Sequence, residues 1–405
     1  MNSNLLCILF AFFVFNIELS DCLVLRGQLQ RHNAEKLRRY QRLRRENHVK
    51  KLYTPDYPQE PLTFDIYIGK DTSQSTPYRL SVETMETQMW TLAPNYPLLT
   101  KENHFYDHTK SKSSWAEGSW YGYTGEFLVS GWEYGDLVKF NNDTVFNQTF
   151  GCVSNAYGSV EPYNDPVFDG IDGALGLAWN VDFDNTPAYK SEPIRNILNY
   201  DKNVSRENHF YVLWVASNGK EQTNSSSGRH YDWQITFGHL DLVHCERNFK
   251  MTSLSAGEHS EPKFMMTKFT FGEYDYYMGS DSIIVDTGSP VIYMPKKVHS
   301  EVFYIISPDY DWDTGLYTVN CSYTDTYADW VFSLGQDDYK VPSTTYIMDV
   351  GLGDGRCILS LGISETEYSD SWVLGNPWLM EHCVLFSVKD NQIGFAKPKN
   401  LAPQI

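Results

Sequence analysis

The chain lacks an apolar run long enough to cross a bilayer. The run at residues 5–15 has 11 apolar residues, whereas a transmembrane helix needs about 20. Small and polar residues follow it near Ser20 and Cys22, although no Lys or Arg precedes it. We therefore expect a cleaved secretory signal peptide over residues 1–22 and no stable membrane span. Membrane anchoring by this segment is the alternative.

Basic residues are scarce, with 33 Lys or Arg against 51 Asp or Glu and a net charge of −18. Ten of the basic residues lie within residues 23–51, which leaves residues 52–405 with 23 basic and 47 acidic residues, a net charge of −24. A basic arm thus precedes an acidic body. The body also has no patch of interleaved basic and aromatic residues, which argues against nucleic acid as a partner.

Motifs of several enzyme classes are absent as well. The sequence contains no Gly-rich phosphate loop and no G-x-S-x-G nucleophile elbow. His239 and His244 flank a stretch that ends at Cys245, but no further ligands follow at the spacing of a metal site. We predict no metal and no other cofactor.

Five Asn-x-Ser/Thr sequences could accept N-linked glycans, each a weak indication by itself. They are Asn142, Asn147, Asn203, Asn224 and Asn320. Together with the predicted signal peptide, they indicate a secreted or lysosomal protein that follows the secretory pathway.

An apolar strand that ends in a tight acidic turn is the most informative feature present. Residues 283–290 read Ile-Ile-Val-Asp-Thr-Gly-Ser-Pro, and the glycine would allow the chain to tighten directly after Asp286. An ordinary β-turn is the alternative, because Asp, Gly and Ser all favour turns. Further distinctive segments accompany this one along the chain, at residues 64–69, 168–177, 372–376, 384–388 and 394–396.

This ordered series resembles the pepsin-like aspartic peptidase family. Residues 64–69 are similar to the strand that opens the mature members, and residues 384–396 are similar to the end of the family's fold. Residues 168–177 and 372–376 are similar to the two buried strands that brace the catalytic loops. The resemblance implies an all-β, bilobal fold with an active-site cleft between two homologous lobes.

Spacing within the chain supports an internal duplication. Glu83 precedes Gly176 by 93 residues, and Asp286 precedes Gly375 by 89. We expect an N-terminal lobe over residues 57–242 and a C-terminal lobe over residues 243–405.

In this family, two carboxylates share one proton and hold a water between them. The charged carboxylate takes a proton from the water, and the neutral one protonates or polarises the scissile carbonyl. By resemblance, Asp286 is one of these carboxylates and Thr287 braces the opposite turn. Gly288 tightens the turn, and the Ser289 hydroxyl orients the carboxylate.

The corresponding turn of the first lobe departs from the family pattern at three positions. Trp90 lies seven residues after Glu83, as the family's Trp follows its first Asp, which fixes the alignment. Glu83 keeps a carboxylate but moves it outward by about 1.5 Å, enough to disturb a shared water. Met85 replaces Gly and is expected to restrict the backbone. Glu86 replaces the orienting hydroxyl and adds a negative charge, so of the four motif residues only Thr84 is kept.

The resemblance also assigns a flap and a disulfide. Residues 115–119 occupy the place of the family's Tyr-Gly pair, so Trp115 either covers the cleft or packs into the core. Cys321 and Cys357 match the family's second-lobe disulfide, which is worth roughly 2 to 4 kcal/mol. Cys7 and Cys22 fall in the predicted signal peptide, so three cysteines remain. These are Cys152, Cys245 and Cys383; pairing of the first with the last is one guess, and a buried free thiol is the alternative for each.

The family resemblance favours a propeptide over residues 23–56. Such a segment lies across the cleft at neutral pH and is loosened when carboxylates protonate in acid. A solvated basic helix, or an arm attracted to nucleic acid or anionic lipid, is the alternative.

Two functions lead from these observations, and both place a peptide or protein in the cleft of a monomer. In the first, the protein binds extended peptides with weak or no proteolytic activity. In the second, it is an active acid endopeptidase that uses a Glu83/Asp286 dyad and an activated water. A storage or structural secretory protein is a third possibility.

Overall fold

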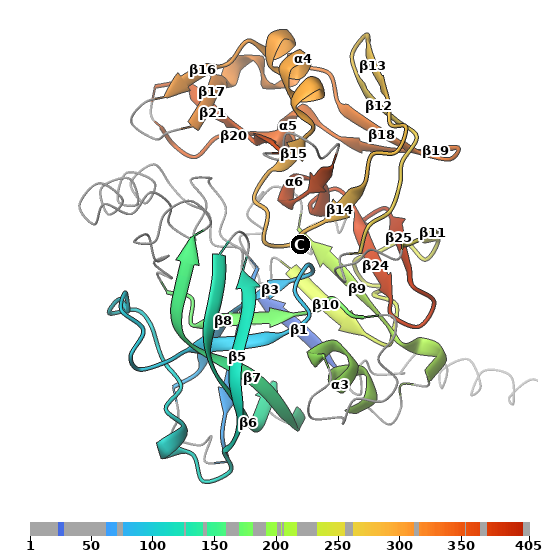
Figure 1. Ribbon diagram of the computed structural model, residues 1–405. Coiled ribbons are helices and arrows are strands. Elements are labelled where there is room, and N and C mark those ends of the chain that lie inside the picture. The colour runs from blue at the N-terminus through green and yellow to red at the C-terminus, as the bar shows by residue number, and fades with distance from the viewer. Residues whose placement is uncertain are drawn as a thin grey trace, which may run out of the picture.

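The structure is a computed structural model of the 405-residue chain, shown in Figure 1. It describes residues 23–27, 62–70, 76–124, 127–140, 144–158, 170–180, 192–200, 204, 206–216, 233–255, 262–311, 316–352, 354–364 and 371–399. The predicted signal peptide lies outside the described residues, as do residues 28–56 of the predicted propeptide and the glycosylation sites Asn142, Asn203 and Asn224.

The first half of the chain forms a seven-stranded sheet with the order β2-β3-β8-β4-β7-β6-β5. The strands are β2 (Thr63–Ile68), β3 (Tyr78–Glu83), β4 (Met89–Leu92), β5 (Trp115–Thr124), β6 (Phe127–Phe140), β7 (Thr144–Gly158) and β8 (Gly173–Gly176). Strand β2 illustrates why they form, because Phe64, Ile66 and Ile68 are buried while Asp65 between them is exposed. This period of two is typical of a strand with one face on a core.

Strands of the second half form three four-stranded sheets, which lie in the upper part of Figure 1. The first contains β13 (Tyr274–Tyr277), β12 (Lys268–Phe271), β18 (Trp330–Leu334) and β19 (Asp337–Val341). The second contains β14 (Ile283–Val285), β23 (Trp372–Leu374), β15 (Ile292–Met294) and β22 (Leu361–Ile363). The third contains β16 (Asp309–Asp311), β17 (Leu316–Asn320), β21 (Arg356–Leu359) and β20 (Ile347–Met348).

A six-stranded sheet joins the two halves. Its strands, in order, are β1 (Val24–Gly27), β10 (Trp233–Phe237), β9 (Phe210–Val215), β24 (Cys383–Ser387), β25 (Gln392–Ala396) and β11 (Lys250–Ser253). Strands from both sides of the expected lobe boundary therefore pair directly, as β9 does with β24. The boundary at residues 242 and 243 stays a prediction.

Helices are short and few among the described residues. The α-helices are α3 (Pro193–Tyr200), α4 (Lys296–Ile306), α5 (Ser343–Tyr346) and α6 (Asn376–Leu379). The 3-10 helices are η2 (His108–Lys110), η4 (Arg206–Asn208) and η5 (Cys321–Thr326).

Strand pairing repeats between the two halves. In the first half, β8 is parallel to β3 and antiparallel to β4, and β4 is parallel to β7. In the second half, β23 is parallel to β14 and antiparallel to β15, and β15 is parallel to β22. This shared pattern is the structural counterpart of the repeated spacing in the sequence, and the predicted all-β fold with two homologous halves is confirmed.

Candidate active site

The two predicted turns meet, although 203 residues separate Thr84 from Thr287. The backbone N–H of each threonine donates to the Oγ1 of the other at 3.1 Å. Each hydroxyl donates in turn to the opposite strand, from Thr84 to Val285 O at 2.9 Å and from Thr287 to Val82 O at 2.5 Å. Both threonines are fully buried, so this reciprocal set of bonds holds the two turns in register. It is the geometry that their predicted bracing roles require.

The two residues that follow β8 fix the backbone of the first turn. Leu177 N donates to Glu83 O at 2.8 Å, and Ala178 N donates to Glu86 O at 2.9 Å. The turn can approach this closely because Gly176 has no side chain, since a Cβ there would lie 2.3 Å from Glu86 O.

Strand β23 fixes the second turn in the same way. Asp286 N donates to Leu374 O at 3.1 Å, and Asn376 N donates to Ser289 O at 2.9 Å. A Cβ on Gly375 would lie 2.3 Å from Ser289 O. The predicted bracing segments 168–177 and 372–376 therefore contact the turns assigned to them.

The candidate carboxylates lie beside each other at Gly288. Glu83 Oε2 is 2.4 Å, and Asp286 Oδ1 is 3.3 Å, from the position that a Cβ on Gly288 would take. Glu83 is buried, with 5% of its surface exposed. Its longer side chain therefore reaches the backbone of the opposite turn.

Space beside residue 288, rather than its backbone conformation, favours glycine there. Positive φ angles occur elsewhere among the described residues, but neither at Gly288 nor at Met85. Neither position therefore uses the left-handed backbone that favours glycine, and the expected effects of Gly288 on the turn and of Met85 on the backbone stay predictions. A side chain on Gly288 would instead have to displace the Glu83 carboxylate.

Burial raises the pKa of the Asp286 carboxyl from 3.8 to about 6. Gly288 N, which donates to Asp286 Oδ1 at 2.9 Å, acts in the opposite direction but is outweighed. A carboxyl that keeps its proton up to about pH 6 can act as a general acid in mildly acidic solution.

Ser289 does not orient Asp286 in this structure. Its buried hydroxyl donates to Val291 O at 2.9 Å. The expectation that this hydroxyl orients the carboxylate is therefore wrong, because its only proton is used within its own turn.

The hairpin of β5 and β6 lies beside the first turn. Its pairing runs from Trp115 opposite Gly135 to Thr124 opposite Phe127, so Trp115 is at the base of the hairpin. The indole ring lies over Gly135, where a Cβ would be 2.0 Å from Cζ2, and Nε1 donates to Glu117 Oε1 at 2.8 Å. These contacts support the packing interpretation of Trp115 rather than the cleft-covering one.

Trp120 lies nearer the tip of this hairpin and was not among the residues predicted from the sequence. This residue is 7% exposed and packs in one cluster with Trp90. A Cβ on Gly122 would lie 3.1 Å from Gln88 Oε1, so the hairpin contacts the segment directly after the first turn. The sequence did contain an indication of this contact, because Tyr121 and Gly122 form a Tyr-Gly pair in this part of the hairpin.

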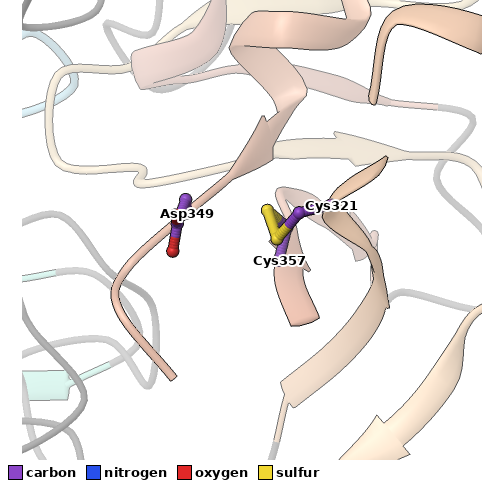
Figure 2. A group of neighbouring side chains, drawn as sticks. All are labelled: Cys321, Asp349 and Cys357. Atoms are coloured by element: carbon purple, nitrogen blue, oxygen red, sulfur yellow. A yellow bond between two sulfur atoms is a disulfide. The ribbon is translucent and has the colours of Figure 1, made fainter. Parts of the chain in front are cut away.

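Cys321 and Cys357 form the disulfide that the resemblance predicts. Figure 2 shows Asp349 close to this bond, and its carboxylate and the two sulfurs lie within 4.8 Å of one another. Because both sulfurs are joined in the disulfide, neither is available as the thiolate that a metal would need. The group is therefore not a metal site.

Cys245 forms the second disulfide with Cys383, so the guess that Cys152 pairs with Cys383 is wrong. The pairing could not be read from the sequence, because it depends on which strand lies beside the connection that carries Cys245. Cys152 is a free thiol in the core, where burial raises its pKa to about 12.

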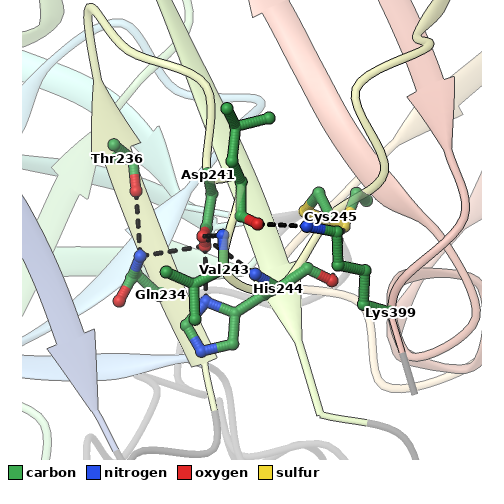
Figure 3. The surroundings of a disulfide bond; sticks show 9 residues. Gln234, Thr236, Asp241, Val243, His244, Cys245 and Lys399 are labelled. Carbon is green, nitrogen blue, oxygen red and sulfur yellow. Dashed lines mark hydrogen bonds and ion pairs between the residues drawn. A yellow bond between two sulfur atoms is a disulfide. The ribbon is translucent and has the colours of Figure 1, made fainter. Parts of the chain in front are cut away.

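Figure 3 shows the surroundings of the second disulfide. His244 Nδ1 hydrogen-bonds Asp241 Oδ2 at 2.7 Å, and its ring stacks on Trp214 with a centroid distance of 3.9 Å. Burial opposes ionisation of Asp241, but hydrogen bonds from His244 outweigh it and lower the pKa of this carboxyl. Gln234 Nε2 donates to the same carboxylate at 2.9 Å. His244 thus belongs to a polar brace of the connection between the two halves.

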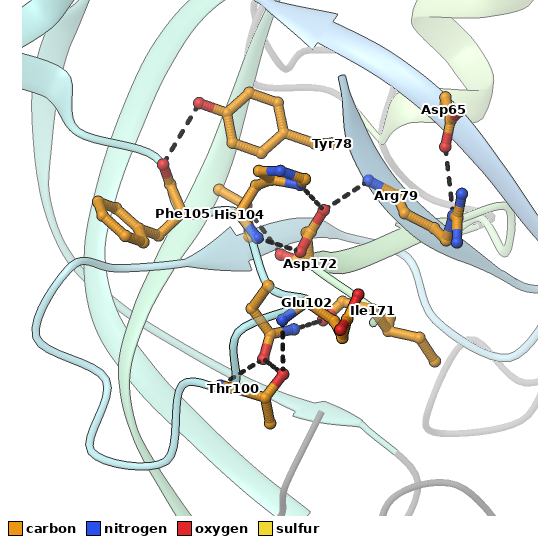
Figure 4. Close-up of polar contacts among 11 residues, drawn as sticks. Asp65, Tyr78, Arg79, Thr100, Glu102, His104, Phe105, Ile171 and Asp172 are labelled. Carbon is orange, nitrogen blue, oxygen red and sulfur yellow. Dashed lines mark hydrogen bonds and ion pairs between the residues drawn. The ribbon is translucent and has the colours of Figure 1, made fainter. Parts of the chain in front are cut away.

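A second buried carboxylate, Asp172, supports strand β8 from its start (Figure 4). It accepts hydrogen bonds from Arg79 N at 2.8 Å and from His104 N at 2.6 Å, and His104 Nδ1 lies 3.3 Å from it. Burial nevertheless raises the pKa of Asp172. Asp172 therefore ties the loop around His104 to the strand that braces the first turn, and its acidic side chain directly before the apolar residues 173–177 was the available indication.

The described glycosylation sites, Asn147 on β7 and Asn320 at the end of β17, are exposed, and their modification stays a prediction. Within the described ranges, no helix combines the length and apolar character needed to cross a bilayer.

Comparison with known proteins agrees with this geometry. Residues 64–398 match the family described as eukaryotic aspartyl protease. Aspartic protease 1 of Caenorhabditis elegans is 27% identical over 357 residues, which cover 82% of this chain and 82% of that protein. Pepsin A of Gallus gallus is 24% identical over 265 residues, which cover 64% of each. Since the family match spans most of the chain and includes both meeting turns, this protein belongs to the eukaryotic aspartyl protease family.

Proposed function

We propose that this protein binds extended peptides across the two turns and hydrolyses them slowly in acid through Glu83 and Asp286. One observation carries this proposal, the approach of both carboxylates to Gly288 between turns locked by Thr84 and Thr287. Two carboxylates placed in this way can share a proton, because ionising both so close together is unfavourable.

In the proposed reaction, a water lies between the two carboxylates. Glu83 takes a proton from the water as the water oxygen attacks the scissile carbonyl carbon. Asp286 gives its own proton to the carbonyl oxygen. The tetrahedral intermediate then releases the amine, which receives the proton held by Glu83, while Asp286 takes back its own as the carbonyl re-forms. The raised pKa of Asp286, about 6, supports its part as the acid.

The longer side chain of Glu83 is the reason to expect a slow reaction. A displacement of about 1 Å from the productive geometry can reduce a rate by a factor on the order of a hundred. Glu83 Oε2 is directed at the backbone of Gly288. The Glu83 carboxylate is therefore less free to move toward the attacking water.

Peptide binding without hydrolysis is the second candidate. The observation in its favour is that Ser289 donates to Val291 O, so its hydroxyl does not orient Asp286. Such a protein would bind a peptide by strand-like hydrogen bonds and release it intact.

The secretory route and acid activation are part of the proposal. Two disulfides support folding in an oxidising compartment. The family match begins at residue 64, which supports a separate basic arm before it. Strand β1, within the predicted propeptide, nevertheless pairs with β10 at the edge of the six-stranded sheet.

Cleavage of a peptide library between about pH 3 and 6 tests the proposal. The secreted, acid-treated protein is compared with Asp286→Asn and Glu83→Asp variants made in the same way. We expect slow cleavage by the wild type, none by Asp286→Asn, and cleavage about ten- to a hundredfold faster by Glu83→Asp.

An inhibitor that mimics the tetrahedral intermediate separates the two candidates. Binding without any cleavage by the folded wild type would leave the peptide-binding function. Absence of both would overturn the proposal and favour a structural role. Equal cleavage by the Asp286→Asn variant would show that another site or a contaminant acts.

A further inference from the structure

The two turns correspond residue by residue. The N–H of each threonine donates to the hydroxyl of the other at 3.1 Å, and each hydroxyl donates to a carbonyl of the opposite strand. A local two-fold axis therefore relates the turns, as the repeated strand pairing around them also requires. Under this relation Glu83 corresponds to Asp286, and Met85 corresponds to Gly288.

On one side of this axis, the longer carboxylate meets the smallest residue. A Cβ on Gly288 would lie 2.4 Å from Glu83 Oε2 and 3.3 Å from the carboxyl carbon Cδ. Real Cβ atoms do not approach an oxygen this closely, so a side chain at residue 288 would force the Glu83 carboxylate to move from this position.

On the other side, the local symmetry places the shorter carboxylate against the larger residue. Asp286 is one methylene shorter than Glu83, and Met85 has the side chain that Gly288 lacks. Met85 is half-buried and has no positive φ, so its backbone carries no strain that only a glycine would relieve.

We infer that Glu83 with Gly288 and Asp286 with Met85 form two size-matched pairs, and that Met85 is a positioning residue that shields the Asp286 carboxyl from bulk solvent while leaving the side that faces Glu83 open to the shared water. The three departures of the first turn are then linked changes rather than separate losses. The inference deepens the proposed function. The role of Met85 in catalysis rests on that function, whereas the two size-matched pairs do not require hydrolysis.

The surroundings of Asp286 agree with a covering side chain. Burial is the largest influence on its carboxyl and raises its pKa to about 6, against the donation from Gly288 N. The charged group that lies beside it is Glu83, from the end of β3, whose carboxylate also approaches Gly288. Thr84, Thr287 and Ser289 contribute hydroxyls and no charge.

The first test measures the Asp286 carboxyl directly. Its titration is followed by carbon NMR in the full-length secreted protein, with Asp286→Asn used to assign the signal. Met85→Gly removes the cover, and Met85→Leu keeps an apolar side chain of similar volume. We expect the midpoint to fall by about one pH unit or more with glycine and to stay in place with leucine.

The inference is overturned if the glycine variant titrates like the wild type, or if leucine shifts the midpoint as much as glycine does. Because the measurement needs no substrate, a shift without any proteolysis would reject the proposed hydrolysis and keep the inference. Proteolysis by the wild type, with the same titration midpoint in the Met85→Gly variant, would keep the proposed hydrolysis and reject the inference.

A second test needs no titration and covers the case in which Met85→Gly fails to fold. Gly288→Ala is made in the wild type and in the Glu83→Asp variant, and melting temperatures are compared. We expect alanine to lower the melting temperature by roughly 4 °C or more beside glutamate and by much less beside aspartate, where the close contact is relieved. Equal losses in both backgrounds would overturn the size-matched pairs.

Discussion

At the scale of single residues, the hydroxyl and backbone amide groups of two threonines join the two turns. Thr84 and Thr287 each donate twice and accept once, and neither is accessible to water. A buried donor or acceptor that loses its partner costs about 1 to 3 kcal/mol. The site is therefore sensitive to changes that remove a hydroxyl while keeping the shape.

Thr84→Val tests this sensitivity. The variant keeps the volume of threonine but leaves Thr287 N and Val285 O without the Thr84 hydroxyl, so we expect a loss of about 2 to 4 kcal/mol of unfolding free energy. Thr84→Ser retains the oxygen and serves as the control, with a loss of about 1 kcal/mol. Denaturant unfolding of both variants measures the difference, and equal losses would show that packing rather than hydrogen bonding matters here.

Asp286 also makes stability depend on pH. Its folded pKa of about 6 lies above the unfolded value of about 3.9, so the folded state binds this proton more tightly. The resulting stabilisation is complete below about pH 4 and is lost as the pH rises through about 6.

We therefore expect the wild type to lose on the order of 2 kcal/mol relative to Asp286→Asn between about pH 4 and 7. Unfolding curves at each pH measure this difference. Asp325→Asn, a change at an exposed carboxylate, is the control and should follow the wild type. If Asp286→Asn also runs parallel to the wild type, the carboxyl does not carry the raised pKa.

At the scale of elements, strand β8 is the support on which the first turn rests, and Asp172 secures its start. The carboxylate accepts hydrogen bonds from Arg79 N in β3 and from His104 N in the loop after β4. Replacing it by asparagine puts an amide group opposite one of these donors, so one buried N–H loses its acceptor.

Asp172→Asn should therefore cost about 1 to 3 kcal/mol of unfolding free energy and loosen the loop around His104. Asp65→Asn is the matched control, because Asp65 contacts the exposed side chain of the same Arg79 at 3.4 Å. A surface ion pair of this kind is worth about 0 to 1 kcal/mol. Hydrogen exchange of residues 100–106 and 173–178 would locate the change, and equal costs for the two variants would contradict the assigned support role.

At the scale of the whole molecule, the Cys245–Cys383 disulfide ties the connection between the halves to the central sheet. It closes a loop of 138 residues in sequence separation, against 36 for Cys321–Cys357. A disulfide that closes a longer loop restricts the unfolded chain more. For this difference in length, the longer loop should add about 1 kcal/mol to the free energy of unfolding.

Removing both cysteines of the longer bridge should thus destabilise the protein by about 1 kcal/mol more than removing both of the shorter one. Thermal unfolding of the two double-alanine variants makes the comparison. A larger loss for the Cys321/Cys357 variant would show that local packing at that bridge outweighs loop length. Cys152 is buried and should react with thiol reagents only on unfolding in each variant.

The sequence by itself determined the family, the all-β class and the identity of both turns, because these depend on local patterns. An apolar strand before Asp286, glycines at Gly176 and Gly375, and Trp90 at its fixed distance from Glu83 are all properties of neighbouring residues. At Gly176 and Gly375, the close approach of another backbone permits no residue other than glycine. The sequence therefore shows this requirement directly.

The tertiary structure decided what depends on partners distant in sequence. Cys383 pairs with Cys245 because strand order places β24 beside that connection, and Ser289 turns to Val291 rather than to Asp286. The close contact at Gly288 comes from Glu83, 205 positions away. Local patterns do not contain such contacts, because they exist only after the two halves have packed together.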